Sequence, residues 1–317
     1  MTADQWGKLF SILNALTWAI ALVLFRKAGD RVSPLALNLF KNTVGFALIA
    51  ATVIAGYALS LGSEFTVPHD LLDVRGWKFW HLVLSGVIGI AIADTLFFYG
   101  LNLAGVGLTA IVDCLYTPFI GVCAWLMLGE QPTPVQILGG AMILSAVAAS
   151  THSKPTGGHT HGQLVAGILM LAAALALMAA AIVFVKPILQ EGRDFWTAGI
   201  RLAAGTLGLL LLAPLRPGLR ELRSVFAPSR DWRVLVPAAF FGAYLAMLLW
   251  VAGNGRTTSA AVAAMLNQCS SIFAIIFAVV FLREPLTWLR GAALAMALGG
   301  AVVILMHERV ESLFAGA

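Results

Sequence analysis

The sequence predicts an all-α integral membrane protein with ten transmembrane helices, arranged as two inverted five-helix repeats. Of the 317 residues, 60% are apolar and only 11% are charged, and the mean hydropathy is +0.91. A soluble globular domain averages about 45–50% apolar and about 25% charged residues. So few charges cannot cover the surface of a soluble protein of this size. The composition therefore excludes a cytosolic enzyme, a disordered chain and a secreted disulfide scaffold.

Apolar runs that approach the length of a membrane span recur along the whole chain. A transmembrane helix needs about 20 predominantly apolar residues. Strands of a membrane barrel alternate apolar and polar residues, whereas these runs are continuously apolar, so helices are expected. The runs are 8–26, 35–57, 79–101, 106–128, 133–151, 163–187, 195–214, 232–252, 258–282 and 287–306. The first run continues as a span, so no removed signal peptide is expected.

A polar stretch divides the ten runs into two blocks of five. Residues 152–162 are expected to link a first five-helix repeat, 1–151, to a second repeat with a short tail, 163–317. An odd number of spans makes the two copies enter the membrane from opposite sides. This gives an inverted repeat, an architecture common among secondary transporters, whose site lies near the midplane between the repeats.

Charged residues inside the spans recur at a constant offset. At 160 positions apart, the matching pairs are Arg26 with Lys186, Lys41 with Arg201, and Gly45 with Gly205. At 154 positions apart, Glu130 matches Glu284. Basic residues inside spans are rare, so their recurrence at one offset favours an internal repeat.

Neither the histidines nor the cysteines indicate a metal or another cofactor. His152, His159 and His161 lie in a Gly- and Thr-rich stretch without cysteines or carboxylates, which favours a solvated linker over a metal site. The cysteines all fall within apolar runs and are expected to be small core residues: Cys114, Cys123 and Cys269. No metal and no cofactor are expected.

Three segments carry a resemblance to a known family. They are Gly86–Gly100 (GVIGIAIADTLFFYG), Ala104–Glu130 and Gly253–Glu284. The chain resembles the drug/metabolite transporter superfamily in its ten-span form with two EamA-type repeats. The family pattern has a small-residue turn, a Pro-aromatic step and a Leu-x-Glu at the far end of the span. The resemblance covers nearly the whole chain and implies this fold and a transport function, but it does not specify the substrate.

The two halves match that pattern unequally. Pro118-Phe119 and Leu128-Gly129-Glu130 fit it, whereas in the second half Ile272 replaces the proline and Leu282-Arg283-Glu284 is kept. The small four-span multidrug relatives carry an essential acidic residue in the first span. Here that span offers only Asn14, beside Trp18. The coupling mechanism of those relatives therefore cannot be carried over.

Polar residues inside the spans are the candidates for a substrate pathway. An intramembrane charge costs about 2.5 kcal/mol or more, so such residues usually face the bundle interior or a wet cavity. Helical spacing places the candidates of the second, fourth, seventh and ninth spans on polar stripes that a central cavity requires. The candidates are Asn14, Trp18, Asn38, Lys41, Asp94, Thr109, Asp113, Tyr116, Arg201, Asn267 and Gln268, with Pro118 as a kink.

Each candidate has a structural alternative. Lys41 and Asp94 fit equally a fixed salt bridge that only locks helices together, and Lys41 is near enough to the end of its span to reach the interface. Asp113 is favoured as functional because its repeat counterpart, Asn267, is also polar. Pro118 removes a backbone donor and kinks the fourth span, as a hinge or as a static bend. Glu284 is expected to cap the helix that follows it.

These features favour a secondary transporter of small polar or amphipathic metabolites such as amino acids, which is expected to act as an exporter by alternating access. The chain has no phosphate-binding loop for ATP, and it lacks the zinc-protease and nucleophile-elbow motifs of membrane enzymes, so no enzymatic activity is expected. A proton-coupled carrier and an uncoupled one both fit, since buried carboxylates titrate near neutrality. The alternative is a channel or a scaffold subunit.

The expected surroundings are a small-molecule substrate and the lipid bilayer, without nucleic acid. The expected location is the inner, or cytoplasmic, membrane, which the chain crosses many times. Ten spans put both termini on one side. The distribution of basic residues favours an outside N-terminus, whereas the resemblance implies a cytoplasmic one, so the orientation is open, as are the direction of transport and the oligomeric state.

Overall fold

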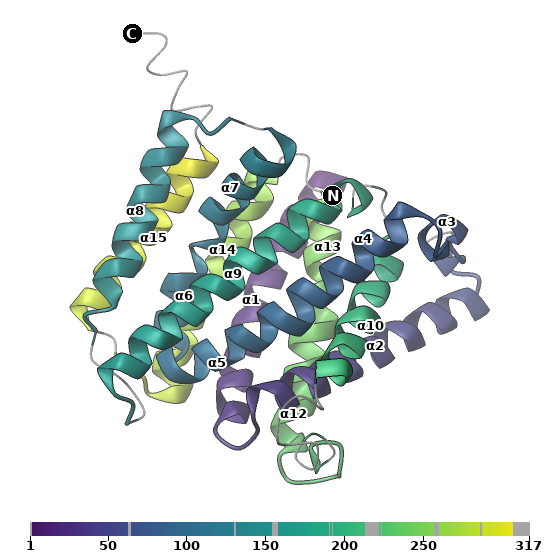
Figure 1. The fold of residues 1–317 in the computed structure, drawn as a ribbon, viewed down its shortest axis with the longest axis horizontal. Helices are drawn as coiled ribbons and strands as arrows, with labels where there is room; N and C mark the ends of the chain where they lie inside the picture. Colours follow the sequence, from purple (N-terminus) through teal and green to yellow (C-terminus); the bar gives the residue numbers. More distant parts are fainter. Residues whose placement is uncertain are drawn as a thin grey trace.

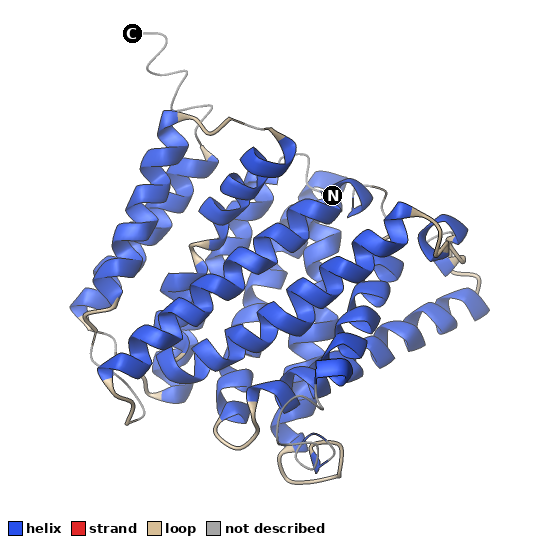
Figure 2. Ribbon diagram, in the orientation of Figure 1, coloured by secondary structure: helices blue, strands red, loops and turns tan. Residues whose placement is uncertain are grey.

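The computed structural model describes residues 2–62, 65–129, 131–153, 158–189, 191, 193–212, 222, 224–256, 260–285 and 287–306. Within these ranges the chain is helical and contains no strand, as Figure 2 shows. The helices of the first half are α1 (Ala3–Gly29), α2 (Pro34–Ala58), α3 (His69–Leu72), α4 (Trp77–Gly86), α5 (Asp94–Ala104), α6 (Val106–Asp113), α7 (Tyr116–Leu128) and α8 (Pro134–Ser150). Those of the second half are α9 (His161–Leu189), α10 (Asp194–Leu212), α12 (Trp232–Ala239), α13 (Ala246–Arg256), α14 (Ala260–Leu282) and α15 (Trp288–Leu305).

Every apolar run that predicts a span is helical over most of the part that the structure describes. Six helical segments of the described chain are long and apolar enough to cross a membrane, and the longest of these is 29 residues. Three further apolar helices are shorter: Pro134–Ser150, Leu266–Leu282 and Trp288–Ile304. The all-helical membrane fold is therefore confirmed, while the number of crossings stays a prediction.

Capping residues that the sequence supplies mark the start of several helices. Thr2 and Gln5 form a capping box at α1, and Thr133 and Gln136 form one at α8. Ser33 accepts a hydrogen bond from Ala36 N at the start of α2. These hydroxyls satisfy backbone N–H groups that have no partner within the helix.

Two segments depart from the continuous α-helices that the apolar runs predict. Between α4 and α5 the chain forms a π-helix, η2 (Val87–Ala93), and between α12 and α13 it forms a second one, η4 (Phe240–Leu245). The two segments begin 153 positions apart, close to the offset of the repeat. Because a π-turn carries an extra residue, it shifts the helix face by part of a turn and often marks a functional site.

The helices of the two halves are interleaved. Helix α1 packs against α13 and α14, and α9 packs against α5 and α7. Helix α2 crosses α10 and contacts η4, while α10 contacts η2. Figure 1 shows α8 and α15 side by side at one edge of the molecule. Equivalent elements of the two halves therefore exchange partners across the bundle.

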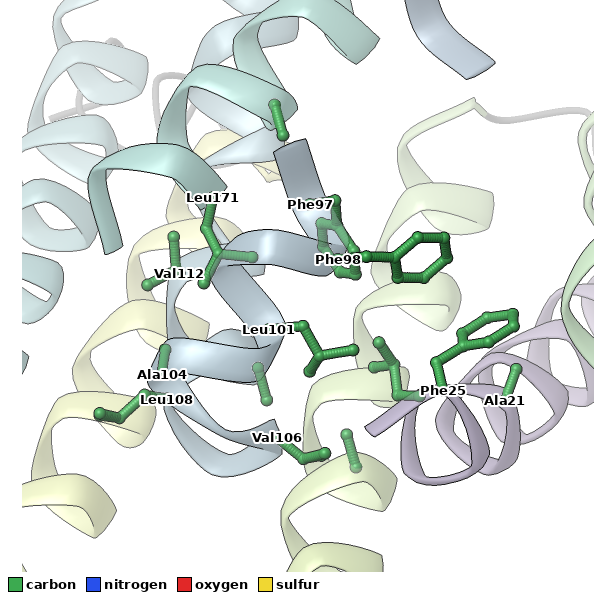
Figure 3. Packing of buried hydrophobic residues seen from close by; sticks show 14 of the residues in the cluster. Ala21, Phe25, Phe97, Phe98, Leu101, Ala104, Val106, Leu108, Val112 and Leu171 are labelled. Atoms are coloured by element: carbon green, nitrogen blue, oxygen red, sulfur yellow. The ribbon is translucent and has the colours of Figure 1, made fainter. Parts of the chain in front are cut away.

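Small residues allow the closest of these approaches. A Cβ atom on Gly45 of α2 would lie 2.6 Å from the Cβ atom of Ala243 in η4, and one on Gly205 of α10 would lie 2.6 Å from Ile90 in η2. Such distances exclude a side chain at either glycine. The core behind these contacts is aromatic and aliphatic, with Phe25 and Phe98 at 4.9 Å between ring centroids (Figure 3).

The expected kink before Pro118 is a short break at Cys114 and Leu115, which keep helical backbone angles. Helix α6 ends at Asp113 and α7 begins at Tyr116. Pro118 has no N–H group to donate to the carbonyl of residue 114, one turn earlier, which is where the helix is interrupted. The break leaves Asp113 and Tyr116 at facing helix ends.

Candidate functional site

The predicted residues of the second and third spans form one hydrogen-bonded cluster at the π-helix. Asn38 Nδ2 donates to the carbonyl oxygen of Ile90 in η2 at 2.8 Å, and it lies 2.9 Å from Thr95 Oγ1. Asn42 Nδ2 donates to Asn38 Oδ1 at 2.7 Å. Carbonyls next to a π-turn have poorly aligned partners within the helix, so an amide from α2 satisfies one of them. Asn38 is fully buried and stabilises the π-turn.

Lys41 and Asp94 form a buried ion pair within this cluster. Lys41 Nζ donates to Asp94 Oδ2, and the two side chains are 6% and 15% exposed. The ammonium also lies 5.9 Å from the ring centroid of Phe25 and 5.2 Å from that of Phe98. The structure therefore contains the salt bridge between α2 and α5 that is the structural alternative for these two residues. The ammonium does not reach outward to the interface.

Arg201 lies opposite this ion pair, on α10 of the other half. The residue is 5% exposed, and its Nε atom has no hydrogen-bond partner. Among the described residues the guanidinium makes no hydrogen bond or ion pair. A Cβ atom on Gly89 of η2 would lie 3.7 Å from Arg201 Nη2, so the guanidinium lies against the π-helix. Its electrostatic neighbours are Tyr116 and Asp94.

Asp113 and Tyr116 lie at the break between α6 and α7. Both are partly buried. Within the described chain the Asp113 carboxylate has no hydrogen-bond or ion-pair partner. Tyr116 interacts electrostatically with both Arg201 and Asp113. The phenol therefore interacts with the guanidinium from the other half and also with the Asp113 carboxylate.

The remaining predicted residues connect helices of the two halves or pack between them. Asn14 Nδ2 donates to Asn267 Oδ1 at 3.0 Å, joining α1 to α14, and Gln268 Nε2 donates to Thr117 Oγ1 at 3.0 Å, joining α14 to α7. Asn267, the repeat counterpart of Asp113, thus pairs with Asn14.

Two other candidates are engaged locally. Thr109 is fully buried, and its hydroxyl donates to the Gly105 carbonyl oxygen of the same helix at 2.7 Å. Trp18 packs against Phe25 and Phe97, with ring centroids at 6.4 and 6.1 Å. Both contacts are of the kind that stabilises a helix bundle.

Three features of the structure were not predicted from the sequence. The π-helices carry no sequence signal that distinguishes them from α-helices. Thr95 lies within an apolar run and was not identified as a candidate. The prediction that Glu284 caps the helix that follows it is wrong. Its carboxylate accepts hydrogen bonds from Val106 N and Gly107 N at the start of α6. Thr287 caps the helix that follows, α15. Glu130 lies outside the described residues.

Two known proteins are similar to this chain in sequence. An archaeal protein of Archaeoglobus fulgidus, named "Uncharacterized transporter", is 30% identical over 142 residues, which are 45% of this chain and 46% of that protein. A protein of Streptantibioticus cattleyicolor, named "Probable terminal-alkyne amino-acid exporter", is 26% identical over 302 residues, covering 94% and 92% of the two chains. The archaeal match spans about half the length of that relative.

A solved crystal structure shares the fold. Its TM-score is 0.63 at 21% sequence identity, and the alignment covers 98% of each chain. A family model for EamA-like transporters matches this sequence twice, at residues 5–151 and 165–306. The two matches cover both helix blocks and leave out the segment between them. The chain is a multi-pass membrane protein that belongs to the EamA-like transporter family, within the drug/metabolite transporter superfamily.

Proposed function

We propose that this protein is a secondary transporter that exports small amino acids or similar zwitterionic metabolites across the inner membrane. In this proposal residues 1–151 and 163–317 are two inverted five-helix repeats, joined by the linker 152–162, which alternate in exposing a central site. The exchange of partners between halves supports this: α1 packs against α13 and α14 as α9 packs against α5 and α7. Such packing lets one half rock against the other around a fixed site.

The observation that carries the proposal is the unpaired Arg201 guanidinium. A charge held in a low-dielectric interior without a partner is costly, and proteins normally provide a counterion. Lys41 has its counterion in Asp94, whereas the described chain provides Arg201 with none. A carboxylate of the substrate would complete this site, since a guanidinium presents two parallel donors that match a carboxylate.

The Asp113 carboxylate supplies the complementary charge. It lies where α6 ends and α7 begins, and Tyr116 interacts electrostatically with both Asp113 and Arg201. A substrate with a carboxylate at Arg201 and an ammonium at Asp113 would neutralise both groups at once. The Streptantibioticus relative, named as an amino-acid exporter, supports the same class of substrate.

Coupling to protons is the second part of the proposal. Asp94 is held by Lys41, so Asp113 is the carboxyl group that would release a proton when the substrate's ammonium binds and would take one up when the substrate leaves. Transport in reconstituted vesicles, measured with and without a pH gradient, tests this. A rate that responds to the gradient in the wild type and not in Asp113→Asn is expected, and equal rates in both conditions would indicate an uncoupled carrier.

The substrate assignment is tested by competition in vesicles. Arg201→Gln is expected to weaken inhibition by amino acids about tenfold or more and to leave inhibition by the corresponding amino amides nearly unchanged. Arg201→Lys is expected to weaken inhibition by amino acids less than Arg201→Gln does, because an ammonium keeps the charge but lacks the bidentate geometry of a guanidinium. The matched control is Arg26→Gln, an arginine already paired with Asp30 outside the site.

Two results would contradict the assignment. An equal loss for amino acids and amides in Arg201→Gln, together with a large drop in the melting temperature, would mean that Arg201 braces the fold. A steady ionic conductance through the purified protein would indicate a channel instead of a carrier.

A further inference from the structure

Two ion pairs near the protein surface each connect the two halves of the chain at a helix end. Arg31 Nη1, in the loop after α1, lies 3.1 Å from Asp231 Oδ1 at the start of α12. Lys78 Nζ, at the start of α4, lies 2.7 Å from Glu191 Oε1 in the segment after α9. Helix α2 separates the two pairs, and its 25 residues span about 37 Å at 1.5 Å per residue.

Figure 1 shows α3 and α12 at opposite ends of α2. We name the two ends of the bundle the α3 face, with Lys78 and Glu191, and the α12 face, with Arg31 and Asp231. The two pairs therefore lie on different faces.

The four residues occupy only two positions of the internal repeat. Arg31 falls on Glu191 at the offset of 160 that also superposes the buried cations of the second and seventh spans. Lys78 falls on Asp231 at the offset of 153 that superposes η2 on η4. The same contact is thus present twice, with both charges reversed. Attraction depends on the product of the charges, so either polarity closes the contact.

We propose that these two ion pairs are the gates of the transporter, one on each face. This inference rests on the proposed function, since it assumes that the halves rock against each other. Each pair joins the end of the first span of one half to the start of the third span of the other half. The structure holds both pairs closed, and a rocking motion that separates these elements on one face presses their equivalents together on the other, so that one pair opens while the other stays closed.

The two gates are unequal in their contacts. On the α3 face, Asp70 also accepts hydrogen bonds from Lys78, at 3.1 Å, and from Arg193, so four charged groups form a network. On the α12 face, the Arg31 side chain is 68% exposed, and a cavity of about 210 Å³ lies against the pair. Isolated exposed pairs contribute little, whereas networks hold better. The α12 face is therefore the one that opens first.

Thiol accessibility behind each gate tests the proposal. Ala28 lines the cavity at the α12 face and is 4% exposed, and Ile188, its equivalent at the offset of 160, is fully buried at the α3 face. The probes are Ala28→Cys and Ile188→Cys, each labelled in the purified full chain with a small maleimide. The chain without an added cysteine gives the background from the native thiols.

The expected result is reciprocal. Asp231→Asn breaks the α12 gate and should raise labelling of Ala28→Cys about two- to fivefold while lowering labelling of Ile188→Cys, and Glu191→Gln should do the opposite. The double variant Arg31→Glu with Asp231→Lys rebuilds the pair with the polarity of the other face. It should return both probes to their wild-type rates.

The matched control is Asp4→Asn, which removes a pair with Lys8 at 2.7 Å within one helix and should change neither probe. The gates are refuted if both probes change in the same direction, if neither changes, or if the charge-swapped variant fails to restore them. Reciprocal labelling needs no substrate. A chain that labels reciprocally but transports no amino acid would refute the substrate assignment and leave the gates in place.

Discussion

The carboxylate of Glu284 caps Val106, a residue 178 positions earlier in the chain. Glu284 Oε1 accepts a hydrogen bond from Val106 N at 2.8 Å, and Oε2 accepts one from Gly107 N at 2.9 Å. Gly105, with φ at +80°, turns the chain so that these N–H groups point at the second half. The loop after α14 is thereby tied to the start of α6 by two charge-assisted hydrogen bonds.

Removing this cap is expected to weaken the association of the halves. Glu284→Ala should lower the free energy of unfolding by about 1–2 kcal/mol, because two N–H groups at a helix N-terminus lose their acceptor and the helix dipole loses its counter-charge. Glu284→Gln keeps one acceptor and should lose less. Thermal unfolding in detergent measures both, and equal melting temperatures for the three proteins would show that the cap contributes nothing.

The ion pair between Lys41 and Asp94 is expected to stabilise the fold. Lys41→Met leaves a buried carboxylate without a counterion, which typically costs 3–5 kcal/mol. The double variant Lys41→Met with Asp94→Asn removes the stranded charge and should recover most of the loss. Folded yield and melting temperature check this, and a well-folded, fully stable Lys41→Met protein would contradict it.

Asp113 is expected to matter for transport more than for folding. Its carboxylate has no partner in the described chain, so Asp113→Asn strands no other charge. Expression and melting temperature should stay near wild type while transport falls about tenfold, equivalent to about 1.4 kcal/mol of barrier. If the variant fails to fold, or folds and transports at the wild-type rate, Asp113 is not a pathway residue.

The inverted arrangement of the two halves is expected to place equivalent loops on opposite sides of the membrane. Leu61, which is 65% exposed after α2, and Ser229, exposed before α12, lie in loops that separate the second and third spans of their halves. Cysteines at these two positions should react with an impermeant thiol reagent from opposite sides of sealed vesicles. Labelling from the same side would remove the inverted repeat.

The network at the α3 face has a defined pH dependence. Partial burial raises the pKa of Asp70, but the hydrogen bonds from Arg193 and Lys78 lower it by a larger amount. The net pKa is therefore below the ordinary value of 3.8. A carboxylate with a lowered pKa stabilises the folded state above its unfolded pKa and loses this contribution as the pH falls through the folded pKa. The difference in melting temperature between wild type and Asp70→Asn should be constant from about pH 7 to 5. It should shrink below about pH 4.

The sequence by itself determined the class of this protein. With 60% apolar and 11% charged residues, only a membrane can solvate the chain, and continuous apolar runs in that solvent must be helices. The candidate residues Lys41, Asp94, Asp113 and Arg201 were also evident, because a charge inside an apolar run is visible without a structure. These properties depend on composition and short-range periodicity.

Only the tertiary structure decided which of these charges are paired. The offset of 160 places Lys41 and Arg201 at equivalent positions of the repeat, yet Lys41 forms an ion pair with Asp94, while Arg201 has no hydrogen-bond or ion-pair partner in the described chain. The asymmetry arises because the repeat counterpart of Asp94 is apolar, as Leu248 at the offset of 154 or as Met247 at the offset of 153. Pairing depends on which helices meet. The π-turn at η2 changes the face of the third span on which Asp94 lies, and the sequence carries no local signal for this turn.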